Sequence, residues 1–134
     1  MVTAMIRFTR PLLQQVTKTT TGITGIPVHR NPLPVLIQTY KSTLEALVAL
    51  PASSVYRQGT EALTRKKLDI LTAANGDISA VEKELDEGQI EESLLIASDE
   101  LKLVGKMAEW KAWEPLEAKA EAGQWEYPGT TAST

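Results

Sequence analysis

The chain has no cysteine and only one histidine, His29. Without thiols, the chain has no disulfide, no thiolate metal site and no cysteine nucleophile. A single histidine also excludes a metal site built from several histidines. A serine triad would have to use His29, which lies in a proline-rich stretch with no nucleophile-elbow sequence nearby. We therefore assign no catalytic, metal-binding or cofactor-binding residue from the sequence.

Long apolar runs are absent as well. The longest candidate, residues 46–50, stops at Pro51, far short of the roughly 20 apolar residues that cross a bilayer. The sequence therefore predicts no transmembrane segment. At 134 residues the chain is expected to form one domain with a real hydrophobic core.

Acidic residues are missing from the first 44 positions. This part carries five basic residues, Arg7, Arg10, Lys18, Arg30 and Lys41. Residues 45–134 carry the other nine basic residues and all seventeen acids, and the formal net charge of the chain is −3. An acidic body argues against nucleic acid as a partner.

Residues 1–21 are rich in hydroxyl groups and place two arginines among apolar side chains. This composition is typical of a mitochondrial targeting segment, and a plain basic arm is the alternative.

Residues 21–27 repeat Thr-Gly-Ile before Pro27. Because no Gly-Lys-Ser/Thr follows the glycines, a phosphate loop is disfavoured and a surface turn or extended arm is expected.

Helical periodicity dominates residues 31–110. Asn31 is expected to cap a first helix that has Pro32 at its first position and ends before Pro51. A second helix is expected from Ser53 or Ser54 to about Ala74, and a third from Ile90 to Trp110. The predicted core-facing stripes are Leu33, Ile37, Tyr40, Leu44 and Leu47; then a weaker one of Tyr56, Leu63, Ile70 and Ala74, widened by Val55, Leu68 and Leu71; then Ile90, Leu94, Ala97, Leu101, Val104 and Ala108.

Charged and capping residues add detail to this pattern. Arg57, Glu61 and Arg65 are spaced four apart and should pair along the outer face of the second helix. Asp77 should cap a short helical turn before the third helix. The charge-rich residues 82–92 are expected to form a solvated face.

The predicted fold is all-α: an antiparallel three-helix bundle with an extended N-terminal arm and an extended tail rich in Trp and Pro. We divide the chain into a basic arm and linker (1–30), the bundle (31–110) and a docking tail (111–134). Tryptophan and tyrosine are enriched at interfaces because their rings combine apolar area with a polar edge. The predicted partner-binding residues are Trp110, Trp113, Pro115, Trp125 and Tyr127.

Residues 21–128 also resemble a known family. The stretches that carry the resemblance are Thr21-Gly22-Ile23-Thr24-Gly25-Ile26; Leu50-Pro51 with Tyr56-Arg57 and Thr60-Glu61; Gly88-Gln89-Ile90-Glu91-Glu92; Glu100-Leu101; Met107 and Glu109-Trp110-Lys111; Trp113-Glu114-Pro115-Leu116; and Gln124-Trp125 with Tyr127-Pro128. In order and spacing they are similar to the alpha-subcomplex subunit five family, accessory subunits of mitochondrial respiratory complex I (NADH:ubiquinone oxidoreductase).

The resemblance implies a three-helix domain that is peripheral to the inner membrane, on its matrix side. It implies docking on the peripheral arm with other complex I subunits, in particular the core thirty-kilodalton subunit. It also implies a chain without flavin, iron–sulfur cluster or catalytic residue. On this basis we expect a structural accessory subunit that is not an enzyme.

Two other function classes are weighed against this expectation. Val55-Tyr56-Arg57 is a near-match to the tripeptide of Leu-Tyr-Arg-type mitochondrial adaptors, which bind an acyl carrier protein. Here the tripeptide opens the second helix, whereas in that family it opens the first, and an acidic chain suits an acidic carrier poorly. A small enzyme would need a pair of buried carboxylates in a cleft, which the sequence does not indicate.

Overall fold

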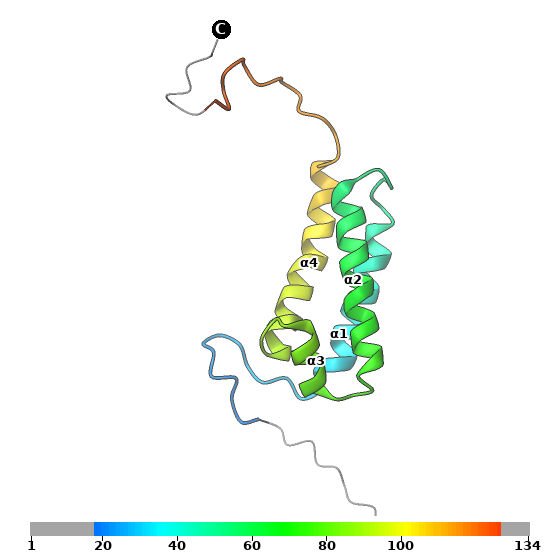
Figure 1. Cartoon of the computed structure of the whole chain (residues 1–134), viewed down its shortest axis with the longest axis vertical. Coiled ribbons are helices and arrows are strands. Elements are labelled where there is room, and N and C mark those ends of the chain that lie inside the picture. The colour runs from blue at the N-terminus through cyan, green and yellow to red at the C-terminus, as the bar shows by residue number, and fades with distance from the viewer. Residues whose placement is uncertain (1–17, 127–134) are drawn as a thin grey trace, which may run out of the picture.

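The computed structural model describes residues 18–126, and within them every regular element is a helix. The four helices are α1 (Pro32–Leu47), α2 (Val55–Ala73), α3 (Ile78–Leu85) and α4 (Ile90–Trp110), as Figure 1 shows. The all-α prediction is confirmed. The described part has four helices rather than three, because the short helical turn predicted after Asp77 is itself a regular helix, the eight-residue α3.

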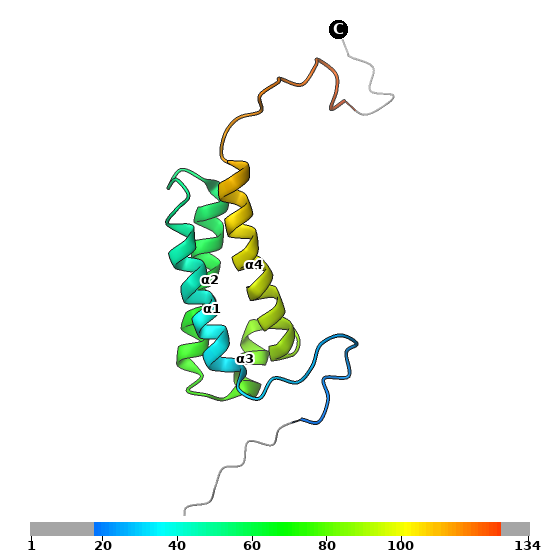
Figure 2. The ribbon, with the colours of Figure 1, turned by 180° about the vertical axis from the view of Figure 1, so that it is seen from behind.

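The three long helices lie side by side, and α3 lies at one end of the group, as both views show (Figures 1 and 2). α1 packs against both α4 and α2, whereas α3 bridges α2 and α4. The start of α2 and the end of α4 lie together near the end of α1, because Tyr56 and Met107 pack on the same cluster as Leu47. α1 and α4 therefore run in one direction and α2 runs in the other.

Local sequence signals explain where the helices begin. Pro32, in the first turn of α1, has no N–H that would need a partner. Asn31 occupies the cap position as predicted, but its side chain makes no capping hydrogen bond. The side chain of Ser54 accepts from the backbone N–H of Arg57, and Asp77 caps α3 by accepting from the backbone N–H of Ser79 at 3.0 Å.

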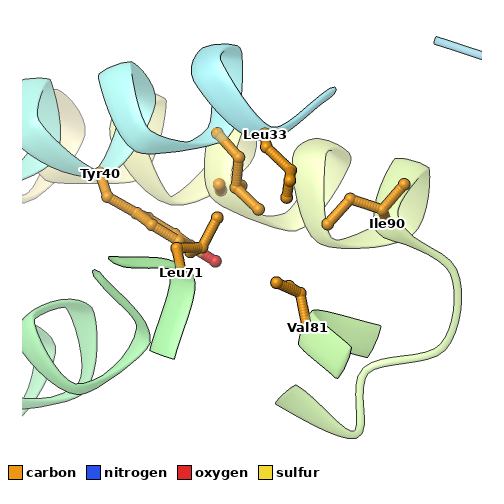
Figure 3. Packing of buried hydrophobic residues seen from close by; sticks show 7 residues of the cluster. Leu33, Tyr40, Leu71, Val81 and Ile90 are labelled. Atoms are coloured by element: carbon orange, nitrogen blue, oxygen red, sulfur yellow. The ribbon is translucent and has the colours of Figure 1, made fainter. Parts of the chain in front are cut away.

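The larger part of the core lies where α1, α3 and the first half of α4 meet (Figure 3). Tyr40 extends from α1 toward Leu71 of α2, while Val81 of α3 and Ile90 of α4 close the cluster. The buried members are Leu33, Leu36, Tyr40, Leu71, Val81, Ile90 and Ala97. Burial of these side chains fixes α3 against the longer helices, since each contributes apolar area removed from water.

A smaller cluster closes the opposite end. Leu47, Leu50 and Val104 are buried there, and Met107 and Trp113 pack against them. This cluster ties the end of α4 and the residues just beyond it to the end of α1.

The predicted stripes need three corrections. On α1, Leu36 is fully buried and Ile37 only partly, because α1 contacts helices on two sides and so buries a wider face. On α2 the predicted stripe is wrong at Leu63 and Val55, which are exposed, and it omits Thr64, which is buried. Leu71, predicted to widen the stripe, is buried as expected. On α4, Leu101 is only partly buried, so the predicted core role belongs to Ile90, Ala97 and Val104.

Candidate docking surfaces

Within residues 18–126, no group of three or more His, Asp or Glu side chains is arranged to hold a metal ion. The helices of this part of the chain are all too short or too polar to cross a bilayer. The features that could have a function are surfaces, and three of them stand out: the C-terminal tail, the N-terminal arm and a groove between α2 and α4.

Two of the three tryptophans of the chain are exposed to solvent. Trp110 is 62 % exposed at the end of α4, and Trp125, in the tail, is 85 % exposed. Trp113, one of the predicted partner-binding residues, is instead partly buried against the cluster of Leu47, Leu50 and Val104. Lys111 makes this possible, because its left-handed backbone (φ 51°) ends α4 and turns the chain back. Pro115 is exposed, and Tyr127 lies outside the described residues.

The N-terminal arm is held against the start of α4 by a polar network. The Nζ of Lys18 lies 2.5 Å from Oε2 of Glu91 and donates to Oε1 of Gln89 at 2.8 Å. The side-chain amide of Gln89 donates to the carbonyl of Thr21 at 2.7 Å. The backbone N–H of His29 donates to Oε1 of Glu91 at 3.3 Å. Both ends of the described part of the arm, residues 18–30, are thus fixed on the carboxylate of Glu91.

Glu91 is almost fully buried in this network. Burial on its own would raise the pKa of Glu91, but the hydrogen bonds from Lys18 and from backbone N–H groups outweigh it and lower the pKa below its usual value of 4.5. The predicted solvated face at residues 82–92 is therefore wrong at Glu91. The position of Glu91 in the first turn of α4 also favours its charged form, because the helix dipole favours a negative charge there.

The repeated Thr-Gly-Ile forms a closed turn and is not a loose arm. The hydroxyl of Thr21 donates to the carbonyl of Ile26 at 2.6 Å, and the N–H of Ile23 donates to the same hydroxyl oxygen at 3.2 Å. Gly22 and Gly25 have φ of 71° and 85°, which favours glycine. Thr21 is buried, so the expectation of a purely surface segment is wrong at this residue.

A groove of about 320 Å³ separates α2 from α4. Tyr40 and Thr43 of α1 lie in its floor, and Tyr56 of α2 reaches across it to donate a hydrogen bond to Glu100 of α4. Burial, reinforced by the hydrogen bond to the Glu100 carboxylate, raises the pKa of Tyr56 to about 12. The phenol therefore remains a proton donor to Glu100 throughout the physiological pH range.

The near-match to the adaptor tripeptide is engaged in internal contacts. Tyr56 bonds Glu100, and Arg57 donates to the carbonyl of Leu50 while its Nε lies 3.6 Å from Glu61. The predicted pairing along α2 is confirmed, since Arg65 also lies 2.5 Å from Glu61. These contacts give the tyrosine and arginine a structural role at the start of α2.

Sequence reasoning did not identify Lys18, Gln89, Glu91 or Glu100 as site residues. A signal existed for two of them: Gln89 and Glu92 form the capping box of α4, which places Glu91 in its first turn. No sequence signal pairs Lys18 with Glu91, because 73 positions separate them along the chain.

The described residues form a small all-helical protein with exposed tryptophans, an arm fixed on α4 and an open groove between α2 and α4. Comparison with known proteins gives the family. Residues 25–92 match the family described as the ETC complex I subunit conserved region. The chain is 40 % identical over 111 residues to NADH dehydrogenase [ubiquinone] 1 alpha subcomplex subunit 5 of Bos taurus, covering 83 % of this chain and 95 % of that protein.

Two further relatives agree. Subunit MCI4 of the same subcomplex in Candida albicans is 39 % identical over 138 residues, covering 92 % of this chain and 98 % of that protein. The probable mitochondrial subunit 5 of Arabidopsis thaliana is 44 % identical over 104 residues, covering 78 % of this chain and 60 % of that protein. The chain belongs to the NADH dehydrogenase [ubiquinone] 1 alpha subcomplex subunit 5 family, and the resemblance seen in the sequence is confirmed.

Proposed function

We propose that this chain is a non-catalytic accessory subunit of mitochondrial respiratory complex I. The observation that carries the proposal is the 40 % identity that extends over 95 % of the bovine subunit. Its partners are other complex I subunits, and it supports the assembly or stability of the complex without contributing a redox or proton-transfer group. It is a subunit of an NADH:ubiquinone oxidoreductase and not itself an enzyme.

The proposal also covers where the protein lies in the mitochondrion and which part of the complex it contacts. We propose that the chain lies on the matrix side of the inner membrane, peripheral to it, and docks on the peripheral arm against the core thirty-kilodalton subunit. Residues 31–110 serve as an antiparallel three-helix scaffold, with residues 1–30 as a basic arm and residues 111–134 as a docking tail. The acidic balance of the body supports a protein partner over nucleic acid.

The proposed anchors are Trp110, at the end of α4, and Trp125, in the tail. Both rings are mostly exposed in the isolated chain, and interface energy concentrates in a few aromatic side chains that become buried on binding. Pro115 and Tyr127 belong to the same docking segment. Trp113 has a different role, because it already packs on the chain's own helices.

The test begins with the location of the protein. Mitochondrial membranes from the organism of origin are separated on a native gel, and mass spectrometry identifies the bands that contain this chain. We expect the chain in the complex I band. If it is found only outside that band, the proposed function is wrong.

The tail is tested with the double change Trp110→Ala with Trp125→Ala. Each anchor contributes about 2 kcal/mol or more, which alone is about 30-fold, so the loss of both should lower incorporation by roughly 1,000-fold. Circular dichroism of the purified variant should show the same helicity as the wild type, because neither ring belongs to the buried clusters. Normal abundance of the folded variant in the complex I band would exclude the tail as the docking element.

A further inference from the structure

The groove between α2 and α4 has apolar walls that the described chain leaves uncovered. Leu63 of α2 is 52 % exposed and Ile96 of α4 is 47 % exposed, and Val55 at one end is more exposed still. The groove exists because α1 packs closely on both helices, whereas α2 and α4 approach each other much less. The exposure of Leu63 has the same origin, since Leu63 lines the groove.

The floor of the groove is small or polar. Thr43, Thr64 and Ala97 leave space there, and Tyr40 is buried beside them with a hydroxyl that has no hydrogen-bond partner in the described structure. A buried hydroxyl without a partner is uncommon in proteins.

One carboxylate on the groove has no cation beside it. Glu100 accepts from the hydroxyl of Tyr56, and none of the ion pairs found within residues 18–126 involves it. The other charged residue of the groove, Lys67, is paired with Glu87. The groove thus presents one uncompensated negative charge among apolar walls, and covering it without a cation would be unfavourable.

Gly59 adds a steric feature to the same surface. It lies inside α2 and lines the groove, and a Cβ at this position would meet no atom within 4 Å. Glycine inside a helix is destabilising relative to alanine, so the isolated fold gives no steric reason for it. A partner whose backbone approaches α2 closely at Gly59 would supply that reason.

We propose that this groove receives a helix of a neighbouring protein subunit, with an apolar face between Leu63 and Ile96 and one Arg or Lys that pairs with Glu100. Helices commonly bind in this way, with the apolar face in a groove and a few anchor side chains. The charge complement selects this occupant over a second copy of the chain, whose body carries an excess of acidic residues. The proposal rests on the proposed function, because the neighbouring subunit is one of the same complex.

Site-specific photocross-linking identifies the occupant. A benzoylphenylalanine is placed at Leu63 in the full chain, and at the exposed Lys66 as a control. The complex that contains the chain is purified after irradiation, and the joined peptides are sequenced. We expect benzoylphenylalanine at position 63 to cross-link to a helical segment of another subunit that carries an Arg or Lys. We expect no cross-link to that segment from position 66. Cross-links to residues 1–17 of this chain, to a second copy or to lipid would overturn the proposal.

Charge variants test Glu100 directly. Glu100→Gln keeps an acceptor for Tyr56 but removes the charge, and we expect at least about a 10-fold loss of incorporation with unchanged helicity. Asp99→Asn on the neighbouring position is the matched control and should incorporate normally, since Asp99 pairs only with the exposed Lys102. Equal incorporation of the two variants would overturn the proposal.

Two glycine variants distinguish an effect on the stability of the fold from an effect on docking. Gly59→Ala and Gly105→Ala both add a methyl group to a helix where nothing lies within 4 Å, so each should raise the unfolding temperature of the free chain. Only Gly59→Ala should lower incorporation, because Gly105 does not line the groove. If the wild type is in the complex I band but both glycine variants incorporate equally, the groove proposal fails while the proposed function stands. Absence of the wild type from the band refutes the proposed function instead.

Discussion

Loss of the Lys18 ammonium should destabilise the fold and release the N-terminal arm. The side chain of Glu91 is 4 % exposed and that of Lys18 is 36 % exposed. Removing one partner of a fully buried pair costs about 3–5 kcal/mol, but water can reach the site once Lys18 is gone. A charge-assisted hydrogen bond contributes about 1.5–3 kcal/mol. For Lys18→Met we therefore expect a loss of about 1.5 kcal/mol, the low end of that range.

The same pair predicts a pH dependence with a definite sign. The pKa of Glu91 is lower in the folded chain than its usual 4.5. Its contribution to stability is therefore fully present above pH 4.5 and is lost as the pH falls through the lower folded value. In Lys18→Met this part of the acid dependence should be much smaller, because the main cause of the lowered pKa is gone.

Urea unfolding at several pH values measures both effects, and hydrogen exchange of residues 18–30 reports on the arm. Lys41→Met is the matched control, since Lys41 is exposed on α1 and takes part in none of the ion pairs found in the described structure. Equal stability of the two variants near neutral pH would refute the reasoning. So would an unchanged acid dependence in Lys18→Met.

Two further predictions concern the core. Leu36→Ala should cost about 2–5 kcal/mol because Leu36 is fully buried. Leu101→Ala should cost clearly less because Leu101 is only partly buried. Urea unfolding measures the free energy of unfolding of both variants, and an equal loss in the two would contradict the assigned buried face of α4. Trp113→Ala should cost about 1–3 kcal/mol, less than a fully buried tryptophan, because its ring packs on Leu47, Leu50 and Val104. Unchanged thermal unfolding of that variant would place Trp113 with the docking residues instead.

Helix positions followed well from local rules. Pro32, Ser54 and Asp77 mark starts that depend only on residues within a few positions, and α1, α2 and α3 begin close to where these signals place them. Caps and periodicity are short-range properties, which is why one sequence is enough to detect them.

The faces of the helices were predicted less well. Leu63 has the spacing of a core residue but lies on the groove, whereas Thr64, a weaker candidate by hydropathy, is buried. Periodicity identifies an apolar face, but it does not reveal whether another helix of the same chain covers that face. A surface that serves a partner has the same pattern as a core.

The sequence by itself determined the helical class, the helix boundaries, the lack of thiol chemistry and the family. All of these depend on residue types and on spacings of a few positions. Only the tertiary structure decided that Lys18 meets Glu91, that Trp113 packs on its own helices and that Glu100 bonds Tyr56 and takes part in none of the ion pairs found within residues 18–126. These are contacts between residues far apart in the chain, or the lack of them, and they depend on how α1 holds α2 and α4 at different distances.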